Sequence, residues 1–207
     1  MFIKVCGLRT STDVAAAVRA GVDAVGFMLT ESVRRVTPTE AGRLAAEVPP
    51  QVLTVGVFRG EPVDVIRDCV TTAGLRAVQL HGGEPPGHYE ALRDLDVTLI
   101  RATSVASGAD LRPGAYGEEL LIIDSPQPGS GQGWNWSALQ AKPVTGRWLL
   151  AGGLHPGNVA AAITALAPWG VDVSSGVEAR RGIKEPQLIA EFVAAARSNG
   201  PGSTRFE

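Results

Sequence analysis

The chain has 207 residues, which is enough for one domain or at most two. Apolar residues make up 44% of it and charged residues 19%, as in a globular protein with a core of its own. A formal net charge of −2 provides no basic field for nucleic acid, and no run of about 18 apolar residues predicts a membrane span.

The cysteine content and the N-terminal segment indicate a compartment. Cys6 and Cys69 are too few for a disulfide framework and fit a reducing environment. The first residues, MFIKVCGL, lack the charged, apolar and cleavage regions of a secretory signal. We therefore expect a cytoplasmic protein with no membrane or nucleic-acid partner.

Short β-type runs alternate with helical segments along the chain. Apolar, β-branched runs predict eight strands, at residues 2–6, 23–29, 51–58, 76–80, 97–103, 119–124, 147–152 and 171–175. Caps, prolines and glycines bound the helical segments, at residues 11–20, 38–48, 62–73, 86–95, 135–141, 156–167 and from 185 or 186 to 198. Segment 104–118 has a weak helical signal, and residues 199–207 are predicted to form a flexible C-terminal tail.

The strand pattern decides between two architectures. The predicted strands show little alternation of apolar and polar residues, which is typical of parallel strands buried on both faces. Repeated strand–helix units form either an open doubly wound sheet or a closed barrel, and eight units favour the barrel. We predict a single, compact α/β domain over residues 1–198, a (β/α)8 TIM barrel with a short or degenerate fifth helix.

Glycine-rich loops follow the last two predicted strands. Gly152 and Gly153 come at and after the end of the seventh strand, and Ser174, Ser175 and Gly176 come at and after the end of the eighth. Glycine lets the backbone approach a phosphate closely and aim N–H groups at it, and serine hydroxyls add donors. A single glycine pair is often no more than a tight turn. Barrels often bind phosphate with these two loops, so their joint presence favours a phosphate site.

Cys6 ends the first predicted strand and Asp124 ends the sixth, at the edge where barrel enzymes carry their chemistry. The alternative for Cys6 is a small buried hydrophobe, and position alone leaves both interpretations open. The alternative for Asp124 is a cap or a partner for a loop amide. A thiol and a carboxyl that flank one ligand are suited to acid–base chemistry.

Other polar residues also follow strands. Arg34 and Arg35 come after the second strand, and one of them is suited to hold a substrate carboxylate, the alternative being solvated surface. His81 follows the fourth strand and fits a polar wall better than a base, and Asp172 lies in the eighth. His and Cys residues do not recur at ligand spacing, so we expect no metal.

A set of motifs runs in a fixed order from residue 3 to about residue 197. They are KVCGL (4–8), GVDAVGFML (21–29), SVRRVTP (32–38), VGVF (55–58), VQLHG (78–82), PGSGQGWNW (128–136), LAGGLHPGNVAAAI (150–163) and VDVSSGVE (171–178). Together they resemble the phosphoribosylanthranilate isomerase family of tryptophan biosynthesis. No single motif is specific, but their combination is.

The resemblance implies a barrel enzyme without a cofactor that rearranges N-(5-phosphoribosyl)anthranilate, a phosphorylated small molecule, to 1-(2-carboxyphenylamino)-1-deoxyribulose 5-phosphate. It implies that Cys6 is the general base and Asp124 the general acid. Arg34 matches the arginine that contacts the anthranilate part, with Arg35 as the alternative. The other matches are with the phosphate loops, at Gly152, Gly153, Ser174, Ser175 and Gly176, and with further mouth residues, at His81 and Asp172.

Two other functions stay open at this point. One is a related or dual-substrate aminoaldose isomerase that also acts in histidine biosynthesis, although such enzymes usually carry Asp in place of the strand-one cysteine. The other is a phosphate-binding barrel without catalysis, against which the presence of Cys6 and Asp124 argues. We expect a monomer rather than a homodimer.

Overall fold

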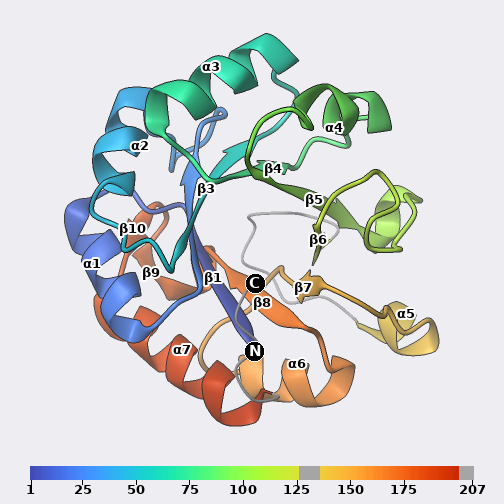
Figure 1. Ribbon diagram of the computed structural model, residues 1–207. Helices are drawn as coiled ribbons and strands as arrows, with labels where there is room; N and C mark the ends of the chain where they lie inside the picture. The colour runs from blue at the N-terminus through green and yellow to red at the C-terminus, as the bar shows by residue number, and fades with distance from the viewer. Residues whose placement is uncertain (126–135, 201–207) are drawn as a thin grey trace.

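The computed structural model describes residues 1–125 and 136–200, and its centre is a closed barrel of parallel strands (Figure 1). The strands follow one another around the barrel in chain order: β1 (Phe2–Cys6), β2 (Ala24–Met28), β3 (Leu53–Phe58), β4 (Ala77–Leu80), β5 (Thr98–Ser104), β6 (Leu120–Asp124), β7 (Trp148–Leu150) and β8 (Gly170–Val173). β8 pairs with β1 and closes the sheet. The predicted (β/α)8 barrel is confirmed.

Helices form a ring around the strands (Figure 1). They are α1 (Ser11–Ala20), α2 (Pro38–Ala45), α3 (Val63–Ala73), α4 (Pro86–Leu92), α5 (Ser137–Ala141), α6 (Val159–Leu166) and α7 (Pro186–Asn199). Thr10 caps α1 in a capping box with Asp13, and Thr37 caps α2 in the same way with Glu40. These local hydrogen bonds explain why the helices start where they do.

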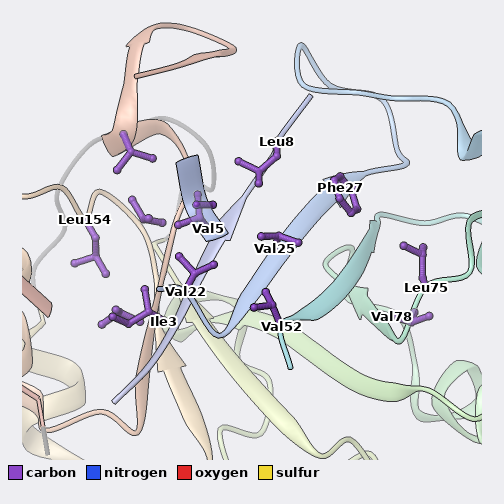
Figure 2. Close-up of a cluster of buried hydrophobic side chains, with 14 of the residues drawn as sticks. Ile3, Val5, Leu8, Val22, Val25, Phe27, Val52, Leu75, Val78 and Leu154 are labelled. Carbon is purple, nitrogen blue, oxygen red and sulfur yellow. The ribbon is translucent and has the colours of Figure 1, made fainter. Parts of the chain in front are cut away.

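Alternation along each strand separates two apolar layers. On β1, Ile3 and Val5 face the helices, whereas Phe2 and Cys6 face the barrel interior. Figure 2 shows the outer layer near β1 and β2, where Ile3, Val5 and Val25 project from the strands. Because both layers are buried, the strands read as continuous apolar runs, and a polar residue that points inward is exceptional.

The fifth unit departs from the strand–helix pattern, as predicted. The described segment between β5 and β6 holds a 3-10 turn, η1 (Val105–Ser107), in place of an α-helix. Arg101 of β5 organises this segment. Its guanidinium donates to Glu118 Oε1 at 2.8 Å and to the carbonyls of Asp110 and Arg112. Where the other strands pack against a helix, β5 is therefore covered by a loop that the buried Arg101–Glu118 ion pair holds in place.

One element after β8 is not predicted from the sequence. The predicted strand 171–175 stops at Val173, and a 3-10 turn, η2 (Ser175–Val177), follows it. A short antiparallel hairpin of β9 (Glu178–Arg180) and β10 (Ile183–Lys184) then precedes α7. Most of the predicted tail, residues 201–207, lies outside the described residues. Within the described part of the chain, no helix is long and apolar enough to cross a membrane.

Candidate active site

A cavity of about 250 Å³ opens at the carboxyl ends of the barrel strands. Six of the residues predicted from the sequence line it: Cys6, Arg34, His81, Asp124, Asp172 and Ser174. They come from distant parts of the chain, and parallel strands bring them together because all carboxyl ends meet at one edge. The cavity is therefore the candidate active site.

Cys6 lies at the end of β1 with its side chain inside the barrel, 6% exposed. Its Sγ atom is 4.0 Å from Met28 Sδ on β2. Burial raises the pKa of the thiol, and the Lys4 ammonium counteracts this rise. Lys4 points the same way from β1 and donates a hydrogen bond to Asp172 Oδ1 at 3.0 Å. Lys4, Cys6 and Asp172 thus form a buried cluster, of which Cys6 and Asp172 line the cavity.

Asp124 ends β6 and is 7% exposed. Its Oδ1 accepts the backbone N–H of Ser125 at 2.6 Å, and its Oδ2 lies 3.4 Å from His81 Nε2. Burial raises the pKa of the Asp124 carboxyl, and the hydrogen bond from Ser125 offsets part of that rise. A carboxyl with a raised pKa is suited to hold a proton and to donate it.

His81 stands beside Asp124 without a positive charge. Burial lowers the pKa of its imidazole to about 4, so the ring is neutral near neutral pH. Its Nδ1 lies 3.4 Å from Gln79 Nε2 on β4. An imidazole with so low a pKa is a weak base towards the Asp124 proton and carries no charge that would favour the carboxylate, which agrees with a polar wall residue. Among the described residues, no group of three or more His, Cys, Asp and Glu side chains is arranged to hold a metal ion.

The structure separates the two adjacent arginines. Arg34 is buried and lines the cavity, whereas Arg35 is exposed. The Arg34 guanidinium forms a bidentate pair with Glu178 of β9, from Nε to Oε1 at 2.6 Å and from Nη2 to Oε2 at 2.9 Å. Glu178 also accepts hydrogen bonds from Lys184 Nζ and from the Gly182 N–H, each at 2.9 Å. The fork of Arg34 is therefore fixed in direction before any ligand binds.

A second, smaller cavity of about 40 Å³ lies between the loops after β7 and β8. Gly152, Gly153, Ser174 and Ser175 line it together with Asp124. Gly152 has a φ of 85°, and a Cβ there would come within 2.7 Å of Asp124 Oδ1. A side chain at this position would therefore fill the space between the loop and the carboxyl.

Two of the predicted phosphate-loop residues stabilise contacts within the protein itself. The Ser174 hydroxyl donates to the Cys6 carbonyl at 3.0 Å and accepts from Lys184 Nζ at 3.3 Å. We expected this hydroxyl to donate to a bound phosphate, but in the structure its proton goes to the Cys6 carbonyl oxygen. A Cβ on Gly176 would lie 1.8 Å from the Leu154 carbonyl oxygen, so this glycine lets the two loops touch.

Comparison with known proteins decides the family. A family model described as N-(5'phosphoribosyl)anthranilate (PRA) isomerase matches residues 3–195. The curated N-(5'-phosphoribosyl)anthranilate isomerase of Deinococcus radiodurans is 41% identical over 204 residues, which cover 94% of this chain and 96% of the relative. This chain belongs to the phosphoribosylanthranilate isomerase family.

Solved structures agree with membership of the phosphoribosylanthranilate isomerase family. TrpF from Jonesia denitrificans is 46% identical, with a TM-score of 0.88 over 96% of this chain and 97% of that one. A phosphoribosyl anthranilate isomerase in complex with reduced 1-(o-carboxyphenylamino)-1-deoxyribulose 5-phosphate is 33% identical, with a TM-score of 0.83 over 96% and 99% of the two chains. The resemblance found in the sequence motifs is confirmed.

Sequence reasoning did not single out three residues that hold cavity-lining side chains in place: Lys4, Glu178 and Lys184. Lys4 had a signal, since it lies two positions before Cys6 and therefore on the same face of β1. Glu178 is the last residue of the VDVSSGVE motif, but nothing in that motif indicated a partner for Arg34. Lys184 had no signal, because the β9–β10 hairpin is too short to show a strand period. Residues 128–135 of the motif after β6 lie outside the described residues.

Proposed function

We propose that this chain isomerises N-(5-phosphoribosyl)anthranilate to 1-(2-carboxyphenylamino)-1-deoxyribulose 5-phosphate, a step of tryptophan biosynthesis, without a cofactor. The observation that carries the proposal is that Cys6 and Asp124, on β1 and β6, line one cavity. The family relative in complex with a reduced form of that product supports the same substrate class. The small cavity between the β7 and β8 loops is the proposed phosphate site.

Asp124 is the proposed general acid. Its proton goes to the ring oxygen of the ribose, the bond from C1′ to that oxygen breaks, and the anilino nitrogen forms an iminium with C1′. The raised pKa of the Asp124 carboxyl keeps the proton available. Neutral His81, 3.4 Å away, adds no positive charge that would favour the carboxylate.

Cys6 is the proposed general base. The iminium makes the C2′ proton acidic, and the Cys6 thiolate removes it, so that the electron pair forms a double bond between C1′ and C2′. The resulting enolamine tautomerises to the ketone, and no atom is gained or lost overall. Proton transfers of this kind typically contribute about 10²–10⁴-fold each to the rate.

Binding contacts position the substrate for these transfers. Arg34, held by Glu178, is the proposed partner of the anthranilate carboxylate, because a guanidinium matches a carboxylate well. The backbone of Gly152, Gly153 and Ser175 is the proposed cradle of the phosphate. Fixing both ends of the substrate converts binding energy into correct placement of C1′ and C2′.

The first prediction tests the acid and base roles. Cys6→Ser and Asp124→Asn should each lower kcat by about 10²-fold or more, since each removes one proton transfer. The measurement is a coupled fluorescence assay that follows loss of phosphoribosylanthranilate, together with a binding measurement on a reduced product analogue. Cys69→Ala, which changes the helix cysteine, is the matched control and should keep near wild-type turnover.

Near wild-type turnover in Cys6→Ser or Asp124→Asn would show that the role assigned to that residue is wrong. A separate turnover assay with the histidine-pathway aminoaldose distinguishes a single-substrate enzyme from a dual one. Analogue binding without any turnover of either aminoaldose by the unmodified chain would instead identify a phosphate-binding barrel that does not catalyse.

A further inference from the structure

Lys4 is a buried, charged residue that has no role in the reaction proposed above. It lies two residues before Cys6 on β1, so both side chains enter the barrel. None of the Lys4 side chain is exposed, and Nζ donates to Asp172 Oδ1 at 3.0 Å. β1 and β8 are in register here, with Lys4 directly opposite Asp172. The backbone pairing thus places this cation beside Asp172, which lines the cavity.

The neighbouring strand shows how near Lys4 and Cys6 come to each other. Gly26 on β2 pairs with Cys6, and the side chains of Cys6 and Lys4 occupy the space next to it that a side chain would need. A Cβ built on Gly26 would lie 2.9 Å from Cys6 Sγ and 3.3 Å from Lys4 Nζ. The sulfur and the ammonium therefore converge over one glycine. An ammonium has three N–H donors, and the hydrogen bond to Asp172 uses one of them.

The charges around Cys6 act in opposite directions. Burial raises the pKa of its thiol, Lys4 lowers it, Asp172 raises it and Lys184 lowers it. Arg34 also faces Cys6 across the cavity. Burial lowers the pKa of Lys4 itself, but Asp172 and Cys6 together outweigh burial and hold that pKa above its ordinary value. Lys4 is therefore an ammonium, and it is the leading cation in the surroundings of the sulfur.

We propose that Lys4 is the positioning residue that stabilises the Cys6 thiolate, and that Asp172 sets how much of the Lys4 charge the sulfur experiences. The inference rests on the proposed role of Cys6 as base. A buried thiolate needs a nearby cation. The substrate iminium is a cation, but it forms only after ring opening, whereas Lys4 is in place before the substrate arrives.

The second prediction tests this through the pH dependence of Cys6 alkylation by iodoacetamide. A Cys69→Ala background leaves one thiol, and no turnover is required. Lys4→Met should raise the pKa of the Cys6 thiol by about one unit, which slows alkylation roughly tenfold below that pKa. Asp172→Asn should shift the thiol pKa downwards and speed alkylation.

Lys184→Met is the matched control, because Lys184 is also buried and also paired with a buried carboxylate, Glu178. Its Nζ atom contacts Ser174 and Glu178, so its removal should shift the thiol pKa less than Lys4→Met does. An equal shift in both variants would contradict a specific role for Lys4.

An unchanged thiol pKa in Lys4→Met overturns the proposal and leaves Lys4 as a structural partner of Asp172. If Lys4→Met does not fold, Asp172→Asn decides, because it keeps the ammonium and the shape of the side chain; a thiol pKa that fails to fall then overturns the proposal. The alkylation experiment and the turnover assay can fail independently. If the thiol pKa shifts as expected but the unmodified chain shows no isomerase turnover, the role of Lys4 is supported and the proposed function is contradicted.

Discussion

At the residue scale, burial acts on the two proposed catalytic groups in the same direction with opposite consequences. It raises the pKa of Asp124 and that of Cys6. For an acid that must carry a proton this is favourable, and for a base that must lose one it is unfavourable. The difference lies in the neighbours: neutral His81 stands beside the carboxyl, and the Lys4 ammonium stands beside the sulfur.

The third prediction separates Arg34 from Arg35. Arg34→Ala should lower kcat/KM by about 100-fold, mostly through KM, because it removes a charge-assisted contact to the carboxylate. Arg35→Ala changes an exposed neighbour and should stay within about twofold of the unmodified chain. Steady-state kinetics measure both. A KM that rises as much in Arg35→Ala as in Arg34→Ala would contradict the assignment.

At the scale of elements, the β9–β10 hairpin connects parts of the site that strands alone would leave separate. Glu178 orients Arg34, whose loop follows β2. Lys184 Nζ donates a hydrogen bond to the Ser174 carbonyl at 2.8 Å, and the Ser174 hydroxyl donates one to the Cys6 carbonyl. The proposed carboxylate contact, the phosphate loop and the end of β1 are thus joined by one ion-pair network.

The fourth prediction concerns acid stability. Burial opposes ionisation of Glu178, but hydrogen bonds from Arg34 and Lys184 outweigh burial and lower the pKa of this carboxyl from 4.5 to about 2. The resulting stability is present above about pH 4.5 and is lost as pH falls towards about 2. Glu178→Gln should lower the free energy of unfolding at neutral pH by roughly 2–3 kcal/mol.

Urea unfolding at a series of pH values measures this effect. Over the acid range, the free energy of unfolding of Glu178→Gln should fall less steeply than that of the unmodified chain. Glu90→Gln is the control, because that side chain is 70% exposed and its ion pair with Arg93 lies on the surface. Equal slopes in the unmodified chain and Glu178→Gln would show that the network does not stabilise the fold through this charge.

At the scale of the whole molecule, the barrel depends on a tight closure between β7, β8 and β1. Gly170 starts β8 and pairs with Phe2 on one side and Leu149 on the other. A Cβ at Gly170 would lie 2.4 Å from the Phe2 carbonyl oxygen and 2.4 Å from Leu149 Cδ2. Closure therefore requires a residue without a side chain at this point.

The fifth prediction compares the same substitution, glycine to alanine, at two positions. Gly170→Ala should lower the free energy of unfolding by about 1–3 kcal/mol, because backbone and side chain must move apart. Gly87→Ala lies in α4, where the new Cβ meets no described atom within 4 Å apart from its chain neighbours and the backbone of its own helix, and should raise stability by up to about 1 kcal/mol. Thermal unfolding measures both, and a stable Gly170→Ala variant would contradict the closure argument.

The expected monomer stays a prediction at this scale, and light scattering on the purified chain measures it. Among the described residues, the large apolar side chains that are exposed are Val33, Val65 and Ile183. Val33 lines the cavity and Ile183 lies in β10, so neither belongs to the helical ring.

The sequence by itself determined the eight strand–helix units and the placing of Cys6 and Asp124 at strand ends. Apolar runs, caps and glycines act over a few residues, so their effect is visible locally. The degenerate fifth unit was visible for the same reason, as a missing helical period. The family motifs added the roles that the resemblance implies.

Only the tertiary structure decided which arginine faces the cavity, that Ser174 is tied to Cys6, and that Lys4 meets Asp172. These contacts join residues as far as 168 positions apart, and side-chain direction at such distances follows from sheet register and barrel closure. Arg34 and Arg35 lie in a loop, where no helix or strand periodicity indicates which side chain points towards the cavity. The surroundings of Cys6 were therefore decided by the closed barrel, although its position was evident in the sequence.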